Sequence, residues 1–173
     1  MKRWSLLLLA AVAVEGCAVV SAPVRREAVP VGPFEEFRQR PETLLNRTVI
    51  LGGEIIETRN LADGTVILVL HRPLGLGQSP RAEAPSGGRF LVRFAEYLDP
   101  VLFAPGRSVT VAGRVLGAET ELVGEAPYRY VTLEGREIHL WKEPTTPPPP
   151  YWWPHDPWYP WWNDPRYGRR PWR

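Results

Sequence analysis

The stretch "TVILGGEIIETR", residues 48–59, and the stretch "TVILVLHR", residues 65–72, predict the fold of this chain. Both are rich in β-branched residues, which favour strands. Asp63-Gly64 lies between them and is a strong hairpin signal. The pair Gly52-Gly53 interrupts the first stretch, and glycine inside a strand usually marks a bulge or the sharp bend of a barrel. The two stretches therefore predict a bent β-hairpin.

The segments on either side extend this prediction. Upstream, "FEEFRQRPETLL" (34–45) permits one or two short helical turns, with Phe34, Phe37, Leu44 and Leu45 on the buried side. Downstream, a Gly/Pro-rich loop over 73–88 precedes four more strand-like segments: 89–94, 108–117, 128–135 and 136–141. Short strands with glycine bends and no long helix are typical of small barrels or sandwiches. We predict an all-β fold, a small OB-like, partly open barrel of five to six strands, preceded by a short helical segment.

Residues 1–16 have the organisation of a targeting signal. Met1-Lys2-Arg3 is a short positive stretch, and the residues from Leu6 to Val14 are apolar. This apolar run is shorter than the roughly 20 residues that a helix needs to cross a bilayer. One interpretation is a secretory signal that the general signal peptidase cleaves.

The end of the signal supports a second interpretation, a bacterial lipoprotein signal. Val14-Glu15-Gly16-Cys17 places an aliphatic residue three positions before a cysteine and a small residue directly before it, although Glu15 departs from the usual small or aliphatic residue. In lipoproteins the thiol is alkylated by diacylglycerol, the chain is cut before the cysteine, and the new amino group is acylated. Only a thiol forms the thioether, and Cys17 is the only cysteine of the chain. We predict that Cys17 is the lipid attachment point.

Lipidation at Cys17 would define where the protein resides. Two or more acyl chains hold a protein stably on a membrane without a spanning helix. The residue after the cysteine is Ala18 rather than Asp, which in many Gram-negative bacteria retains lipoproteins in the inner membrane. The expected location is therefore the outer membrane. Residues 17–33 follow as a lipid-anchored tether, because Pro23, Pro30 and Pro33 disfavour regular elements there.

The segment 144–173 differs from the rest of the chain. It contains ten prolines and six tryptophans, and proline at that density predicts an extended or disordered backbone outside the 34–143 β-domain. Exposed aromatic side chains favour burial, so the tail is expected to contact a lipid headgroup interface, a partner or its own barrel. The expected interface or ligand contacts are Trp152, Trp153, Trp158, Trp161, Trp162, Arg169 and Arg170.

The sequence offers little for catalysis. The three histidines His71, His139 and His155 are scattered, and no His, Asp or Glu group has the spacing of metal ligands. Cys17 would be consumed by lipid. We therefore predict that the protein is not an enzyme, with no catalytic residues, metal site or cofactor.

The charge distribution disfavours a nucleic-acid partner. The formal charge is +2, of which residues 1–16 contribute +1 and the tail contributes +2, from four Arg and two Asp, so 17–143 carry about −1. A slightly acidic body has no basic face for a phosphate backbone. The expected partners are the membrane, through the lipid anchor, and envelope proteins, peptidoglycan or lipopolysaccharide.

Several short motifs between residues 17 and 141 give the chain a family resemblance. They are Gly16-Cys17, "GGEIIET" (52–58), "RPL" (72–74), Gly-Arg-Phe-Leu (88–91), "YLDP" (97–100), "VAGRVLG" (111–117), "YRYVTL" (128–133) and "HLW" (139–141). In this order they resemble the Slp family of Gram-negative outer-membrane lipoproteins, the starvation-inducible lipoprotein type. The resemblance implies a lipid-anchored envelope protein without an established enzymatic activity.

Two hypotheses for function follow. The first is an outer-membrane lipoprotein with a structural or interaction role at the periplasmic face. The alternative is an OB-like module that binds a glycan, peptidoglycan or lipopolysaccharide, since OB barrels often bind oligosaccharides or oligonucleotides. Fold alone does not establish such a ligand. The alternative requires one barrel face with converging aromatic and polar groups.

Overall fold

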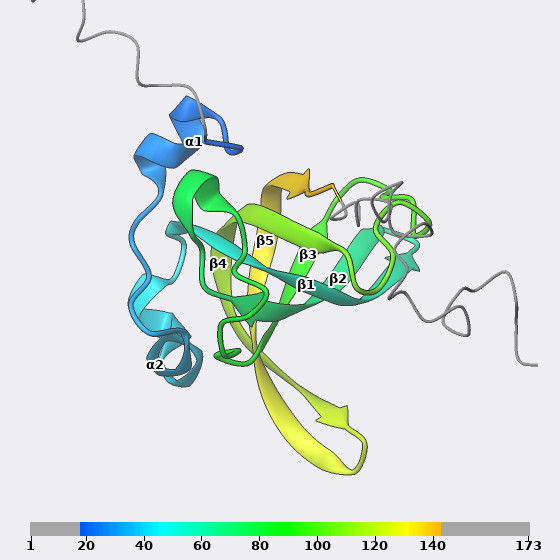
Figure 1. Cartoon of the computed structure of the whole chain (residues 1–173). Coiled ribbons are helices and arrows are strands. Elements are labelled where there is room, and N and C mark those ends of the chain that lie inside the picture. Colours follow the sequence, from blue (N-terminus) through cyan, green and yellow to red (C-terminus); the bar gives the residue numbers. More distant parts are fainter. Residues whose placement is uncertain (1–17, 143–173) are drawn as a thin grey trace, which may run out of the picture. The chain divides into compact units, whose positions relative to one another are not determined.

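The structure is a computed structural model that describes residues 18–142 (Figure 1). No helix in this part of the chain is long and apolar enough to cross a membrane. The elements, in chain order, are α1 (Ala22–Glu27), α2 (Phe34–Gln39), the 3-10 turn η2 (Pro41–Leu44), β1 (Thr48–Leu61), β2 (Gly64–Arg72), the 3-10 turn η3 (Leu76–Gln78), β3 (Arg89–Phe94), β4 (Ser108–Val123) and β5 (Ala126–Leu140).

The five strands form a closed barrel in the order β1-β2-β3-β5-β4. Neighbouring strands are antiparallel except β3 and β5, which are parallel. The predicted all-β, OB-like barrel is confirmed, as is the hairpin at Asp63-Gly64, where Leu61 pairs with Gly64. The barrel is closed rather than partly open, because β1 pairs along one edge with β2 and along the other with β4.

The barrel has five strands because the segments 128–135 and 136–141, predicted as separate strands, belong to β5. Gly135 lies at the predicted break and pairs with Gly113 of β4 beside a register shift. A bulge of this kind bends a strand pair without ending it. The ring of Phe94 lies against Gly135, where a Cβ would come within 2.2 Å of Cε1 of Phe94. The glycine therefore lets the strand continue past a core aromatic ring.

The pair Gly52-Gly53 lies where β1 is held between β2 and β4. Gly53 pairs with His71 on one side and Val109 on the other. A Cβ at Gly53 would lie 2.1 Å from the carbonyl oxygen of Leu70, a distance that real Cβ atoms do not reach. The register shift of the β1–β2 pair follows shortly afterwards, between Ile55 and Glu57. The glycine pair thus permits the close approach that closes the barrel.

Alternate residues of the strands fill the barrel interior, as a period-2 pattern requires. The fully buried side chains of this core include Val49, Ile67, Val69, Phe90, Val92, Val109, Val111, Val131 and Leu133. Phe34 and Phe37 of α2 close one end of the barrel, and Leu98 from the β3–β4 loop joins the same core. The predicted burial of Phe34 and Phe37 is confirmed, whereas Leu45 is 47% exposed.

Residues 18–33 do not form the irregular tether that the prolines predict. They contain α1, in which Pro23 occupies the first turn, where its missing N–H breaks no helical hydrogen bond. Val20 and Val24 are buried against Ala112 of β4. The N–H of Val29 donates to the carbonyl of Thr48 at the start of β1, over 2.9 Å. The segment is therefore part of the folded barrel domain.

Candidate functional site

The residues predicted to make functional contacts lie outside the described part of the chain. They are the lipidation site Cys17 and the tail residues Trp152, Trp153, Trp158, Trp161, Trp162, Arg169 and Arg170. Val20 and Trp141 lie near the two ends of the described chain, and both contact the barrel. The barrel itself offers three regions to assess: the outer face of β2 and β3, two cavities near α2, and the attachment of the N-terminal segment.

The outer face of β2 and β3 is where OB barrels commonly hold oligomeric ligands. In this chain that face is covered. Val66, Leu68 and Leu91 point outward from it, yet Leu91 has no exposed surface. Tyr130, Tyr128 and Val123 of the long β4–β5 hairpin pack against them as a second apolar cluster. The aromatic rings that could stack on a ligand are thus packed within the protein.

Ion pairs occupy the charged side chains around this covered face. Their N–O distances are 2.7 Å for Arg93–Glu119, 3.3 Å for Arg59–Glu121 and 2.6 Å for Arg114–Glu134. Pairs exposed to this degree contribute about 0–1 kcal/mol each to stability. Their more important consequence is that these arginines are already neutralised by carboxylates and form no free cationic track.

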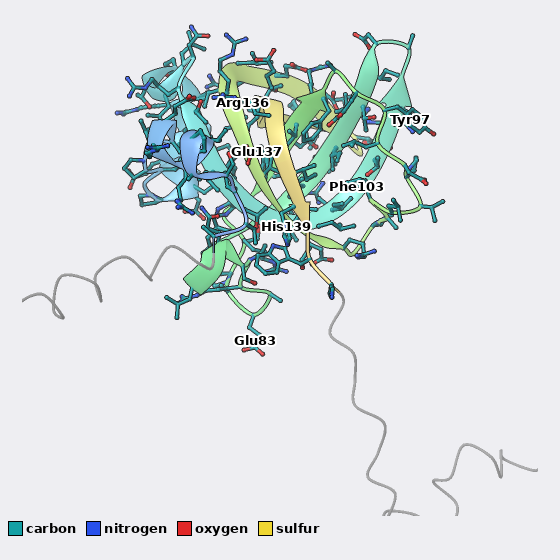
Figure 2. All side chains as sticks on the ribbon, turned by 90° about the horizontal axis from the view of Figure 1, so that it is seen from above. Glu83, Tyr97, Phe103, Arg136, Glu137 and His139 are labelled. Carbon is teal, nitrogen blue, oxygen red and sulfur yellow. The ribbon has the colours of Figure 1, made fainter. Side chains whose placement is uncertain are left out.

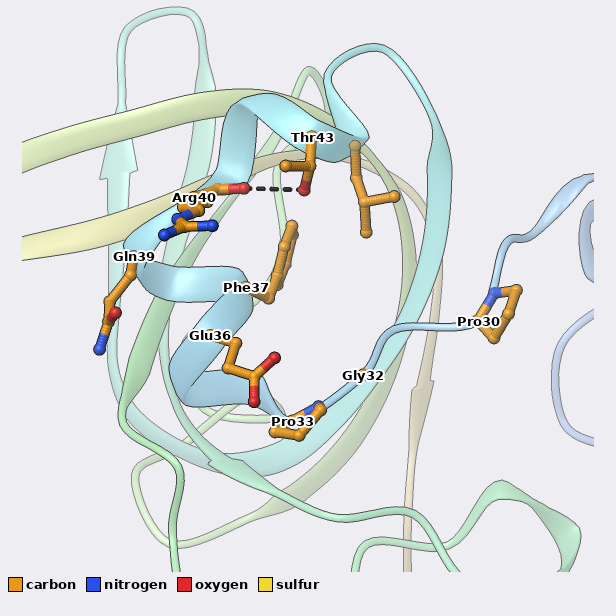
Figure 3. Close-up of a pocket in the computed structure, with 9 residues that line it drawn as sticks. Pro30, Gly32, Pro33, Glu36, Phe37, Gln39, Arg40 and Thr43 are labelled. Atoms are coloured by element: carbon orange, nitrogen blue, oxygen red, sulfur yellow. Dashed lines mark hydrogen bonds between the residues drawn. The ribbon is translucent and has the colours of Figure 1, made fainter.

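A cavity of about 460 Å³ lies beside α2 and η2 (Figure 3). Phe37 forms its apolar wall, while Glu36 and Arg40 at its rim are exposed to solvent. The hydroxyl of Thr43 donates to the carbonyl oxygen of Arg40 over 2.8 Å, a local bond that fixes the turn. The lining contains no histidine or cysteine. The Thr43 hydroxyl is engaged by its local bond to Arg40, and Glu36 is exposed at the rim, so the hollow brings together no nucleophile with a base.

A second cavity, of about 350 Å³, contains His71 in its lining. The imidazole stacks on Phe34, with ring centroids 4.2 Å apart and planes 10° apart. Burial lowers the pKa of His71 to about 4. The ring is therefore neutral at physiological pH and a weak base. His71 is half-buried and packs on Phe34, which helps to close the end of the barrel.

The pH dependence of stability follows from His71. An unfolded histidine titrates near 6.5, so as pH falls from 6.5 towards 4 the unfolded chain binds a proton that the folded chain does not. We expect the free energy of unfolding to fall over this window by about 1–2 kcal/mol from His71, allowing for its partial exposure. Urea unfolding at several pH values measures this. In His71→Phe, which keeps the ring stacked on Phe34, the free energy of unfolding should fall between pH 6.5 and 4 by about 1–2 kcal/mol less than in the wild type. An equal fall in both proteins would contradict the lowered pKa of His71.

The N-terminal segment is attached through buried and charged contacts. The N–H of Val20 donates to Oε1 of Gln78 in the β2–β3 loop over 3.1 Å, and the N–H of Ser21 donates to Oε2 of Glu137 on β5 over 2.8 Å. Arg136 of β5 forms an ion pair with Glu27 at the end of α1. Figure 2 shows Arg136, Glu137 and His139 following one another along β5. The chain is thus fixed to the barrel from Val20 onward.

Gln78 connects the two ends of the described chain. Its carbonyl oxygen accepts the hydroxyl of Thr110 over 2.7 Å, and that hydroxyl oxygen accepts Nε1–H of Trp141 over 2.9 Å. Gln78 has a φ of 66°, in the left-handed region that a non-glycine residue seldom adopts. Its bonds to Val20 and Thr110 hold it there. Val20 and Trp141 are therefore brought to the same side of the barrel.

None of Gln78, Thr110, Arg136 or Glu137 was singled out from the sequence. Among the described residues, no group of three or more His, Cys, Asp or Glu side chains could hold a metal ion. The contacts that these residues make attach other parts of the chain to the barrel. They hold the N-terminal segment and Trp141 on the barrel surface.

Comparison with solved structures finds matches of low similarity. The small single-stranded DNA-binding protein of Streptomyces coelicolor is 18% identical, with 55% of this chain and 94% of that chain covered and a TM-score of 0.35. The mitochondrial single-stranded DNA-binding protein Rim1 of S. cerevisiae is 14% identical, with 57% and 97% covered and a TM-score of 0.36. Similarity at this level says nothing about what the chain binds.

Comparison of sequences finds relatives that span most of the chain. An uncharacterized protein of Haemophilus influenzae is 31% identical over 144 residues, which are 83% of this chain and 76% of that protein. The uncharacterized lipoprotein YeaY of Escherichia coli is 27% identical, covering 94% and 80%, and the outer membrane protein Slp of the same species is 23% identical, covering 82% and 76%.

A family model extends across nearly the whole chain. The model described as "Outer membrane lipoprotein Slp family" matches residues 14–167. The match includes the junction before Cys17, the entire barrel and most of the tail. With relatives that carry the names lipoprotein and outer membrane protein, it confirms the resemblance and the outer-membrane location. The chain belongs to the Slp family of outer membrane lipoproteins.

Proposed function

We propose that the mature chain begins at Cys17, carries lipid on that residue, and holds a non-enzymatic barrel at the periplasmic face of the outer membrane in a structural or interaction role. The sequence Val14-Glu15-Gly16-Cys17 and the family both support the lipid attachment. The observation that carries the proposal is the attachment of Val20 to the barrel, three residues after Cys17. An anchor at Cys17 would then hold the folded domain itself, without a long flexible spacer.

The reach of such an anchor is short. Three residues span at most about 11 Å when fully extended. Each acyl methylene buried in the membrane contributes about 0.8 kcal/mol, so a triacylated cysteine stays in the bilayer. Because Val20 is 3% exposed and hydrogen-bonded to Gln78, the chain has no slack beyond those three residues. The barrel surface around Val20 would therefore lie within the headgroup region or directly above it.

A non-enzymatic role is supported by the chemistry of the described residues. His71 has a lowered pKa and packs on Phe34, and the larger cavity has no histidine or cysteine in its lining. The alternative of a glycan-binding OB module has no corresponding support, because the outer face of β2 and β3 is filled by Tyr128 and Tyr130. We therefore retain the structural or interaction role.

The tail, residues 144–173, is proposed to contact the same membrane surface. Three residues before it, Trp141 bonds through its indole to Thr110 beside Gln78, the residue that also binds Val20. The tryptophans of the tail suit a headgroup interface, and its arginines suit anionic phosphates. The proposed contacts are Trp152, Trp153, Trp158, Trp161, Trp162, Arg169 and Arg170.

A test of the tail uses tryptophan fluorescence of the peptide 144–173. Anionic phospholipid vesicles are expected to shift the emission to the blue, because the indole rings leave water. High salt should weaken the association without abolishing it, since only the arginine part is screened. An unshifted spectrum with both phospholipid vesicles and lipopolysaccharide would count against membrane contact and favour a protein partner.

The periplasmic orientation is tested by protease access. The protein should fractionate with the outer membrane, remain intact when whole cells are treated with protease, and be digested after the outer membrane is permeabilised. A periplasmic protein and a surface-exposed lipoprotein in the same cells serve as controls. Digestion in intact cells, at the rate of the surface control, would place the barrel on the outer face and contradict the proposal.

A further inference from the structure

We propose that the tip of the β2–β3 loop, residues 74–81, is a membrane-contact surface that inserts Leu76 among the phospholipids of the leaflet that holds the anchor. This inference rests on the proposed lipidation of Cys17. It adds to that proposal which face of the barrel meets the bilayer and which side chain enters it.

Leu76 is the most exposed large apolar side chain of the described chain. Its side chain is 99% exposed, at the first position of η3. A leucine left entirely in water forgoes the stabilisation that burial gives, so contact with an apolar phase would stabilise it. Figure 2 shows the loop, marked by Glu83, projecting beyond the barrel on the side of His139.

The loop tip is held in place rather than free. The N–H of Gly75 donates to the carbonyl of Ser79 over 2.7 Å, and Leu74 forms a β-bridge with Pro80. Leu74 and Pro80 both pack over Gly52 of β1. The left-handed conformation of Gln78 completes this small hairpin. Leu76 is therefore presented by a fixed support, and ordering it costs little further entropy on contact.

The loop tip lies next to the point where the anchor begins. Gln78, two residues after Leu76, accepts the N–H of Val20 over 3.1 Å. The three residue steps from Val20 back to Cys17 span at most about 11 Å, and the headgroup layer of one leaflet is about 5–8 Å thick. An acylated Cys17 at the hydrocarbon boundary would therefore bring the Gln78 turn, and Leu76 with it, to the headgroups.

The charges around this surface suit an anionic phospholipid layer. Arg25 and Arg26 of α1 and Arg81 of the loop form no ion pair with another described residue, and Glu83 is an exposed acid of the same loop. Three cations and one acid leave a net charge of +2 on this set. Cations close to the surface are attracted to anionic headgroups.

The β3–β4 loop carries another set of exposed apolar side chains. Tyr97, Val101 and Leu102 of the β3–β4 loop are 71%, 81% and 56% exposed. Figures 1 and 2 place this loop on the other side of the barrel from α1 and η3. An anchor that reaches only about 11 Å from Val20 cannot bring both loops to one bilayer. These residues therefore serve as the internal control.

The experiment uses single thiols in the full lipidated protein. Cys17 is the chain's only cysteine, and lipidation blocks its thiol, so a new cysteine can be labelled alone. Leu76→Cys is compared with Val101→Cys and with Leu122→Cys on the β4–β5 hairpin, both at exposed positions where substitution leaves the core intact. Each variant carries an environment-sensitive fluorophore and is reconstituted in vesicles of phosphatidylethanolamine and phosphatidylglycerol.

The expected result is a several-fold difference between sites. The label at 76 should be quenched by spin-labelled phospholipid and protected from aqueous iodide, while the labels at 101 and 122 should show the reverse. A label at 76 that iodide quenches as strongly as the label at 101 would overturn the inference. A label at 76 protected from both quenchers would also overturn it, by indicating contact with a second copy of the chain. Uptake of label by the wild-type protein would instead reveal a free Cys17 thiol and refute the proposed lipidation.

Discussion

Gly53→Ala is expected to destabilise the barrel by about 3 kcal/mol or more, at the upper end of what overpacking costs. The added methyl would lie 2.1 Å from the Leu70 carbonyl oxygen and 2.6 Å from Cγ1 of Val69. Neither the backbone of β2 nor the fully buried Val69 can move without disturbing the pairing of β1 with β2 and β4. Thermal unfolding should show a midpoint lowered by about 10 °C or more.

Gly32→Ala is the matched control for this substitution. A Cβ at Gly32 would meet nothing within 4 Å, and the residue is exposed. Its effect should stay within about 0.5 kcal/mol, as for most surface changes. If the Gly53 variant has the same unfolding midpoint temperature as the Gly32 variant, β1 and β2 do not approach each other as closely as the barrel requires.

Cys17→Ala should abolish stable attachment to the membrane. Without the thiol there is no thioether, and the acyl chains that would hold the protein are absent. The tail and Leu76 alone give a weaker, reversible contact. Fractionation should show unprocessed precursor or released protein in place of the outer-membrane form.

A suitable control is Ala18→Ser, which changes the neighbouring position and keeps the thiol. It should fractionate as the wild type does. Retention of the Cys17→Ala protein in the outer membrane, in processed form and at the wild-type level, would mean that another part of the chain provides the anchor.

The strand pattern of the barrel could be predicted from the sequence because it depends on local signals. The β-branched stretches on either side of Asp63-Gly64 form β1 and β2, and the hairpin lies where those residues place it. Gly52-Gly53 marked the bend because glycine is needed wherever another backbone comes this close. Closure of the barrel was not predicted, since it depends on pairing between β1 and β4, whose partners are far apart in the chain.

The N-terminal segment shows where local reasoning failed. Pro23 predicts an irregular segment together with Pro30 and Pro33, yet at the first turn of α1 a proline is favourable. Val20 and Val24, four residues apart, form the apolar face that a helical pattern would indicate, and they are buried on Ala112. A short helix of this kind is stabilised by the surface it packs on, and that surface is not visible in the local sequence.

The loop that presents Leu76 was predicted only as a polar connection. Its conformation depends on bonds between Val20 and Gln78 and between Thr110 and Gln78, which lie 58 and 32 residues apart. No sequence pattern within residues 73–88 indicates that Val20 and Thr110 are the partners. The proposed lipid attachment site, in contrast, can be predicted from adjacent residues because lipoprotein-modifying enzymes read a short linear motif.

The most direct test of the central claim is the intact mass of the protein purified from envelopes. We predict a chain that begins at Cys17 and carries the added mass of a diacylglyceryl group on the thiol and an acyl chain on the new amino group. Proteolysis should then return this added mass on the N-terminal peptide. A mature chain that begins at another residue, or an N-terminal peptide with an unmodified Cys17 thiol, would contradict the account.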